Sequence, residues 1–199
     1  MSSSGIAEAT TRERLLSAAR ELTEEGGYAA ASVVAITQRA GLASGTLYRH
    51  FPSKAELFVE LFRTVCQREL EVGREAAERD VDSTVERIES VLQTFAERAL
   101  RNPRLAWALI AESVDPLVDA ERLAYRSHYA SLLAAGLRAA IAAGEVPEQN
   151  VDFTAAALVG GVGEALVGPL SPLAGHPPSS AEIAASMRSF VRRAVGAGV

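Results

Sequence analysis

The chain has 199 residues, of which 48% are apolar and 23% are charged, and its formal net charge is −5 at pH 7. This length allows one sizeable domain or two small ones with a shared core, and the composition is ordinary for a globular protein. The single cysteine, Cys66, excludes an intrachain disulfide and argues against a cysteine-based metal site, which fits a reducing compartment.

No targeting signal is recognisable. The opening residues, MSSSGIAEATTRER, lack the apolar segment of a signal peptide, and we find no apolar run that approaches the roughly 18 residues of a bilayer span. We expect a cytoplasmic protein with no membrane partner.

Helical signals dominate, because Ala, Leu, Glu and Arg recur at three- and four-residue spacing and no strand-like alternation is found. Residues 1–9 form a flexible lead-in. Thr10, followed by Glu13, predicts a capping box for a first helix that stops at Gly26-Gly27. Ser32 can cap a second, short helix that ends at Gly41.

Ser44 can cap a third helix, with Leu47 and Phe51 inward, that Pro52 stops. Ser53 begins a fourth helix that runs to about Asp80, some 40 Å at the usual rise per residue. The later breaks predict five more helices, at roughly 82–101, 103–113, 117–143, 151–168 and 180–197. The sequence therefore predicts an all-α chain of about nine helices, with a DNA-binding domain over 10–54 and a regulatory bundle over 55–199.

Helices two and three, joined by a tight turn at Gly41, predict a helix-turn-helix. From residue 26 to residue 55 the chain has no acid, while Arg39, Arg49 and Lys54 supply positive charge. A local field of this kind, rather than net charge, attracts an anion such as DNA. An ordinary polar face on a helical hairpin is the bland alternative.

The outward face of helix three holds residue types that suit DNA. Gly45 allows close backbone approach, Thr46 and Arg49 can reach bases, and Tyr48 and His50 can donate to phosphates. Lys54 lies in the first turn of helix four, where exposed N–H groups favour an anion. The candidate DNA-binding residues are Ser32, Ser44, Gly45, Thr46, Tyr48, Arg49, His50 and Lys54.

Residues 11–60 resemble the DNA-binding region of the tetracycline-repressor (TetR) family of bacterial transcriptional regulators, most specifically in AGLASGTLYRHFPSK. The resemblance implies that Thr46 and its neighbours enter the major groove and that Tyr48, His50 and Lys54 hold phosphates. It also implies a regulatory bundle that binds a small molecule and forms a homodimer. Since a helix-turn-helix dimer presents two recognition helices, we expect a palindromic operator. We predict a repressor that the small molecule releases from DNA, with an activator as the open alternative. Val34 and Thr37 depart from the family's usual residues in helix two, so a contact there falls to Ser32.

Aromatic residues are scarce, yet several fall in helices five to seven. Tyr125 and Tyr129 share one helical face, and Glu112 and His128 could add polar contacts. Core packing is the alternative for each. The candidate residues for an apolar or aromatic ligand are Phe95, Trp107, Glu112, Tyr125, His128 and Tyr129.

Helix eight carries a face of small side chains, and helix nine carries an apolar stripe. Glycine inside a helix costs about 1 kcal/mol relative to alanine, so a close helix neighbour is the natural compensation. We predict a four-helix dimer interface, with burial inside the monomer as the alternative. Its candidate residues are Phe153, Ala157, Gly161, Ala165, Gly168, Ile183, Met187, Phe190, Val191 and Ala194.

Two other classes of function are weaker. An enzyme would need a nucleophile, a metal-spaced histidine pair or a phosphate-binding loop. Gly161-Val162-Gly163 has neither a preceding strand nor the third glycine of a dinucleotide loop. We expect no enzyme activity, metal or cofactor. A helical adaptor that binds only proteins remains a rival, and salt dependence of DNA binding would separate it from a regulator.

Overall fold

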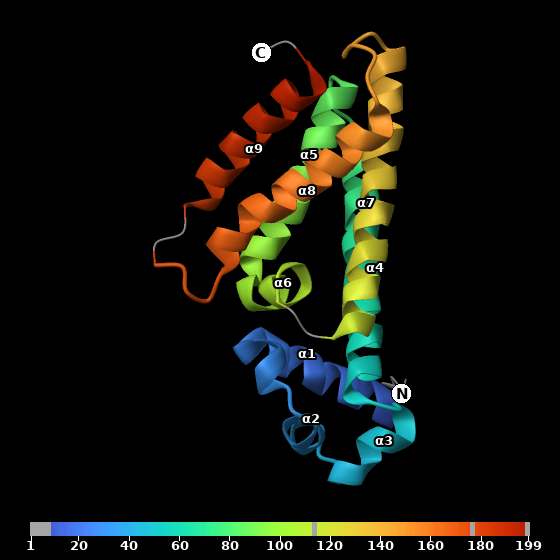
Figure 1. Cartoon of the computed structure of the whole chain (residues 1–199), viewed down its shortest axis with the longest axis vertical. Helices are drawn as coiled ribbons and strands as arrows, with labels where there is room; N and C mark the ends of the chain where they lie inside the picture. The colour runs from blue at the N-terminus through green and yellow to red at the C-terminus, as the bar shows by residue number, and fades with distance from the viewer. Residues whose placement is uncertain (1–8, 113–114, 176–177, 198–199) are drawn as a thin grey trace, which may run out of the picture.

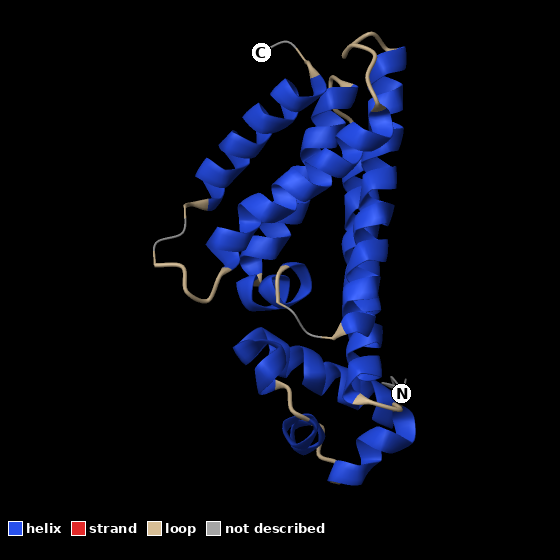
Figure 2. Ribbon diagram, in the orientation of Figure 1, coloured by secondary structure: helices blue, strands red, loops and turns tan. Residues whose placement is uncertain are grey.

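The computed structural model describes residues 9–112, 115–175 and 178–197. In these ranges it has nine α-helices and a short 3₁₀ turn, η1, and no strand, so the all-α prediction is confirmed (Figure 2). The elements are α1 (Thr11–Ala30), α2 (Val33–Arg39), η1 (Ser44–Thr46), α3 (Leu47–His50), α4 (Lys54–Ala77), α5 (Thr84–Arg101), α6 (Pro103–Ile110), α7 (Pro116–Ala142), α8 (Val151–Leu170) and α9 (Ser180–Val195).

The molecule is elongated, with a small head of α1, α2, η1 and α3 at one end and a larger helical body beyond it (Figure 1). The long helix α4 leaves the head and runs up the body beside α7. Its first half belongs to the head's apolar core and its second half to the core of the body. Helix α4 therefore connects the two parts mechanically as well as covalently.

Local capping explains where the head helices begin. The Thr10 hydroxyl accepts the Glu13 N–H at 3.3 Å while the Glu13 carboxylate accepts the Thr10 N–H at 2.7 Å, which confirms the predicted capping box. The hydroxyls of Ser32 and Ser53 each accept an N–H from the first turns of α2 and α4.

One prediction about a helix end is confirmed in part and another is wrong. The helical backbone of α1 is interrupted at Gly26-Gly27, as predicted, with Gly27 at φ 76°, but a further turn continues from there to Ala30. Ser44 does not cap a third α-helix: the segment begins as the η1 turn, whose N-cap is Ala43 and has no side-chain bond. The α-helix that follows, α3, has four residues, which is about one turn.

Helix α8 corrects a further expectation. By length and composition alone it could cross a membrane, although no such run was expected from the sequence. In the structure α8 packs along α7 within the body, and about a quarter of its most apolar window, 28%, is buried. Its apolar residues thus divide between a face in the core and a face left open.

Candidate functional site

Two arginines of α1 hold the helix-turn-helix in place. Arg14 donates to the carbonyl of Ala40 at the end of α2 with a distance of 2.6 Å, and Arg12 donates to the carbonyl of His50 at the end of α3 at 2.8 Å. The Arg12 guanidinium also lies 4.3 Å from the centre of the Phe51 ring. Cations at helix C-termini satisfy the last carbonyls and oppose the helix dipole, so α1 fixes the orientation of both helices.

The acid-free window presents less free charge than its sequence suggests. Both terminal nitrogens of Arg39 bond the carboxylate of Glu25 at 2.8 Å, and one also reaches Glu21 at 3.3 Å. The hydrogen bond from Arg39 lowers the pKa of Glu25. The positive charge of Arg39 is therefore neutralised within the head, where its ion pairs connect α2 to α1.

Lys54 points inward in this structure. Its ammonium donates to the carbonyl of Tyr28 at 3.3 Å and lies 3.8 Å from the centre of the Tyr28 ring, which is a cation–π contact. Partial burial lowers the pKa of Lys54, because desolvation disfavours its charged form. Lys54 thus ties the start of α4 to the end of α1, a contact that its predicted phosphate role does not require.

The open edge of the head consists of η1 and α3. Ser44, Gly45 and Arg49 are exposed, Tyr48 is 59% exposed, and Thr46 and His50 are half-buried beside them. Arg49 forms no ion pair within the described residues, in contrast to Arg39. The Ser32 hydroxyl, by comparison, is engaged as the cap of α2 at 3.1 Å from the Ala35 nitrogen.

Gly45 is not required by the protein's own packing. A Cβ built there meets no atom within 4 Å, and the residue does not need a positive φ. The backbone of this turn is therefore open to close approach by another molecule, next to the guanidinium of Arg49.

Glu112 lies at the junction of head and body rather than in the cavity described below. The bend at Gly26-Gly27 frees the N–H of Tyr28 from the helix, and the Glu112 carboxylate accepts it at 3.2 Å. A Cβ on Gly27 would lie 3.3 Å from the same carboxylate. The Tyr28 peptide is thereby held by Glu112 on one side and by Lys54 on the other.

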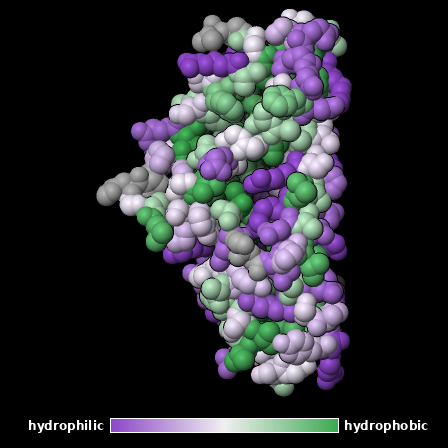
Figure 3. Space-filling view, in the orientation of Figure 1, coloured by the Kyte–Doolittle hydropathy of each residue, from purple (hydrophilic) through white to green (hydrophobic). Residues whose placement is uncertain are grey.

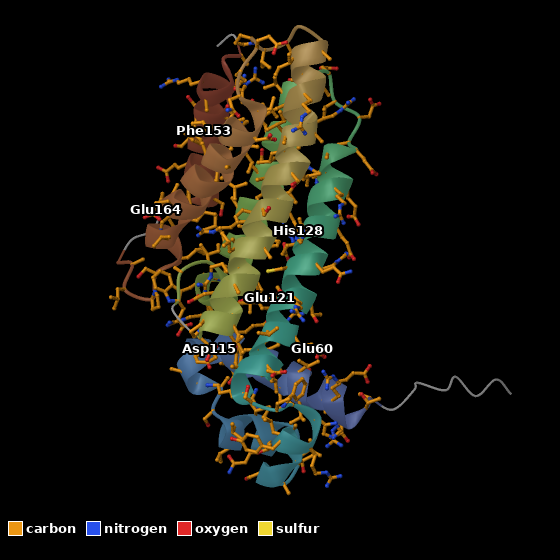
Figure 4. The ribbon with its side chains drawn as sticks, turned by 45° about the vertical axis from the view of Figure 1, so that its right-hand side comes forward. Glu60, Asp115, Glu121, His128, Phe153 and Glu164 are labelled. Atoms are coloured by element: carbon orange, nitrogen blue, oxygen red, sulfur yellow. The ribbon has the colours of Figure 1, made fainter. Side chains whose placement is uncertain are left out.

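The body contains a cavity of about 240 Å³, far larger than one water molecule needs. Of the candidate ligand residues, Phe95, Tyr125 and Tyr129 line it, and their rings pack at centroid distances of 5.4 and 5.6 Å. Trp107 and Glu112 are not part of its lining, and His128 is an exposed residue of α7 (Figure 4).

Most residues of the cavity wall are not among the ligand-binding residues that the sequence predicts. The wall includes Phe62, Cys66 and Glu69 of α4 and several arginines. The distribution of charge along the chain does not predict that these arginines line a cavity. A usable signal does exist: Arg98 follows Phe95 by three residues, and Arg122 precedes Tyr125 by three, so each arginine shares a helical face with a ring. The residues that the sequence did not single out are Arg20, Phe62, Val65, Cys66, Glu69, Leu92, Arg98, Ala99, Arg101, Asn102, Leu105, Ala106, Leu109, Ile110, Arg122, Arg126, Val159, Val162 and Gly163.

The predicted dimer residues of α8 share one exposed face: Phe153, Ala157, Gly161, Ala165 and Gly168. Phe153, on the outer side of α8, is 73% exposed (Figure 4). On α9, Phe190 and Ala194 are exposed and Ile183 is half-buried, whereas Met187 and Val191 pack into the core of the body. Apolar side chains gather over α8 and the adjoining part of α9 (Figure 3), so this surface has no cover within the described chain.

Residues 15–61 match the family model described as bacterial regulatory proteins of the tetR family. Among curated proteins, the chain is 34% identical over 106 residues to the HTH-type transcriptional repressor KstR of Rhodococcus jostii, which covers 53% of this chain and 49% of that protein. It is 39% identical over 108 residues to the HTH-type transcriptional regulator UidR of Escherichia coli K12, covering 48% and 55%. The chain spans about half the length of these relatives.

The fold extends over the whole chain. The fatty acid degradation regulator FadR of Bacillus halodurans superimposes with a TM-score of 0.78 over 93% of this chain and 96% of its own, at 18% identity. FadR of Bacillus subtilis, solved with stearoyl-CoA, gives 0.74 over 92% and 96%, at 20% identity. Over residues 15–61, which contain the helix-turn-helix, the chain is therefore similar to the tetR family of bacterial regulatory proteins, and over most of its length it shares the fold of these regulators.

Proposed function

We propose that this protein is a sequence-specific, DNA-binding transcriptional regulator, a repressor that a small molecule releases from a palindromic operator. One observation carries the proposal: α1 fastens both helices of the helix-turn-helix while η1 and α3 keep Gly45, Tyr48 and Arg49 open. A rigid helix with an exposed glycine turn and an unpaired arginine is suited to entering a major groove. Ser44, Thr46 and His50 complete this edge.

The relatives support the same reading. The curated proteins that match the head are named as transcriptional repressors or regulators, although the match covers about half of each. We assign residues 10–54 to DNA binding and residues 55–199 to ligand binding and dimerisation, with 1–9 as a lead-in. The protein would act in the cytoplasm, where its operator lies.

Dimerisation is supported by the uncovered face of α8 and α9. Small residues such as Gly161 and Ala165 let two helix backbones approach, while Phe153 and Phe190 supply apolar area. Two symmetric copies would present two α3 helices to successive major-groove faces, which requires a palindrome or near-palindrome.

The cavity supplies the place for the ligand. It is lined by α4 to α8 together with Arg20 of α1. Glu112, which follows α6, accepts the backbone N–H of Tyr28 in the head. The FadR structure with stearoyl-CoA supports this fold as one that accepts an acyl ligand. A ligand releases DNA only when it prefers one arrangement of head and body over the other.

Selection of binders from random duplex DNA tests the proposal directly. We expect a palindromic site whose affinity falls steeply with salt, since phosphate contacts release counterions. Arg49→Ala should change the preferred base at its position in each half-site, whereas Arg68→Ala, an exposed arginine of α4 that pairs with Glu71, should change nothing. Absence of selection, with no salt-dependent shift, would favour the protein-binding adaptor.

A further inference from the structure

The charged groups on the cavity wall are mostly positive. Five arginines line it, from α1, α5 and α7, against a single acid in the lining, Glu69. Three of these arginines also pair with acids outside the lining: Arg20 with Glu24, Arg101 with Glu97 and Arg122 with Asp119. Arg98 already bonds both oxygens of Glu69, at 2.6 and 2.7 Å, so the acid has a fixed partner. Arg126 forms no ion pair among the described residues. The remaining wall is apolar, built from side chains such as Phe62 and Leu105.

A neutral hydroxyl in the same cavity lacks a partner. The Tyr125 oxygen is buried and accepts or donates no hydrogen bond within the described chain. Burial also raises the pKa of Tyr125, so the group stays protonated and acts as a donor. Burying an unpaired hydroxyl is costly, and a ligand oxygen would remove that cost.

Arg122 lines the cavity and also closes the end of α6. Its Nε donates to the Leu109 carbonyl at 2.8 Å, and a terminal nitrogen donates to the carbonyl of Glu112 at 2.7 Å and of Ala108 at 3.3 Å. Asp119 contacts its other terminal nitrogen. The Arg122 side chain is 15% exposed, so its charge is largely withdrawn from water.

We propose that the cavity binds an amphipathic anion, an apolar chain that ends in one acidic group, and that Arg122 senses the acid. This deepens the proposed function, because release of DNA is the response that Arg122 would control. The apolar wall takes the chain, and the arginines offset the negative charge of the acid. Tyr125 donates to an oxygen of the ligand.

The sensing step is a competition for one guanidinium. A carboxylate is a stronger acceptor than a backbone carbonyl, so it draws Arg122 away from the end of α6. Glu112, whose carbonyl Arg122 holds, is also the residue whose carboxylate holds the Tyr28 N–H. A change at Arg122 therefore reaches the joint between body and head through a single residue.

The ligand class is tested on the free protein with matched probes. Octanoate, dodecanoate and hexadecanoate are titrated calorimetrically beside the 1-alkanols and alkyltrimethylammonium ions of equal chain length. We expect at least one alkanoate to bind tenfold or more tightly than its matched alcohol, and the cations to bind most weakly. Equal affinities for acid and alcohol, or no binding by any acid, would overturn the proposal.

Tyr125→Phe gives a test that does not depend on a fragile variant. It removes a hydroxyl that has no internal partner, so the fold keeps all its hydrogen bonds. We expect the affinity for the alkanoate to fall severalfold with an unchanged or higher melting temperature. An unchanged affinity would contradict the role of the hydroxyl.

Arg122→Lys tests the sensor, because lysine keeps the charge but cannot bond three carbonyls with a planar fork. We expect operator binding to become insensitive to the alkanoate, while Arg126→Gln weakens the alkanoate but keeps its effect on DNA. If Arg122→Lys does not fold, Glu112→Gln serves the same purpose, since it weakens the bond to Tyr28 without touching the cavity. A full response to the alkanoate in either folded variant would refute the sensing role. Failure of the wild type to bind any operator would instead refute the regulator proposal and leave the free-protein titrations readable.

Discussion

Different kinds of interaction stabilise the head and the body. Residues 10–54 carry six basic against four acidic side chains, and much of that charge is used inside the head, as in Arg14 on Ala40 and Arg39 on Glu25. Residues 55–199 carry fourteen basic against twenty acidic side chains, yet the body's core is built of small and branched apolar groups. Both parts have an apolar core, but in the head the small helices α2 and α3 are additionally held by arginine bonds from α1.

This difference accounts for what each part tolerates. A guanidinium that closes the end of a short helix, as Arg14 does for α2, has few chemical substitutes. A packed apolar core accepts many combinations of similar total volume. The head is thus the part that can be recognised in a sequence, and the body is the part that can acquire a new cavity.

The largest expected effect comes from Gly161→Leu, on the open face of α8. Even a Cβ there would lie 3.0 Å from the Phe190 ring, so a leucine displaces that ring from the surface that we propose joins two chains. We expect a monomer by sedimentation and a loss of operator affinity of at least about 100-fold, because one half-site contributes several kcal/mol.

Gly160→Ala is the matched control, because a Cβ at Gly160 meets nothing within 4 Å. A dimer that survives Gly161→Leu unchanged would place the interface elsewhere on the body.

The next effect is expected from Arg14→Met, which keeps the apolar stem but leaves the carbonyl of Ala40 without its charged donor. We expect the free energy of unfolding of the head to fall by about 2 kcal/mol, the usual worth of a partly buried hydrogen bond to a charge. Arg20→Met should change it by less than about 0.5 kcal/mol, since Arg20 forms an exposed pair with Glu24. Hydrogen exchange of the head amides measures both, and equal effects would show that the bond to Ala40 contributes nothing.

Lys54→Met separates two roles for the same ammonium. If Lys54 mainly ties α4 to Tyr28, the change lowers stability by about 1 kcal/mol and weakens operator binding without altering its salt dependence. If Lys54 holds a phosphate, as the family resemblance implies, the slope of affinity against salt falls by about one. We expect the first result, whereas Arg49→Met should instead change the base that is preferred in each half-site.

Gly45→Ala should have the smallest effect on the protein itself. Nothing lies within 4 Å of the added methyl, so the melting temperature should stay the same or rise slightly. DNA that approaches this backbone would meet the methyl, and operator affinity should then fall severalfold. Unchanged affinity in fluorescence anisotropy would mean that the turn stays clear of the duplex.

The parts of the structure that the sequence predicts well depend on neighbours in the chain. The hydroxyl caps at Thr10, Ser32 and Ser53 bond N–H groups three residues on, so their signal is contained in a few letters. The break before α6 follows from Asn102 and Pro103 in the same way.

Features that depend on distant partners were harder to predict. The acids that neutralise Arg39 lie 14 and 18 residues away on another helix. The acid-free segment 26–55 therefore carries less free positive charge than its sequence predicts. Two glycines usually terminate a helix, so Gly26-Gly27 predicts the break in α1. The turn beyond the break is not predicted, because no local rule says that Glu112, 84 residues from Tyr28, holds it. Trp107 shows the same dependence on distant partners. It lies on α6, which contributes to the cavity wall, but packing of α6 against the body turns its side chain away from the cavity.

Lys54 is the only lysine in the chain, and it lies where the head meets α4. Reductive methylation with isotope-labelled formaldehyde would therefore place a single side-chain label, apart from the amino terminus, at the contact between α4 and the end of α1. The chemical shift of that one methyl signal depends on the Tyr28 ring current, because the ammonium sits 3.8 Å from the ring centre. One resonance would then follow the joint as it opens and closes, with no assignment of the remaining spectrum.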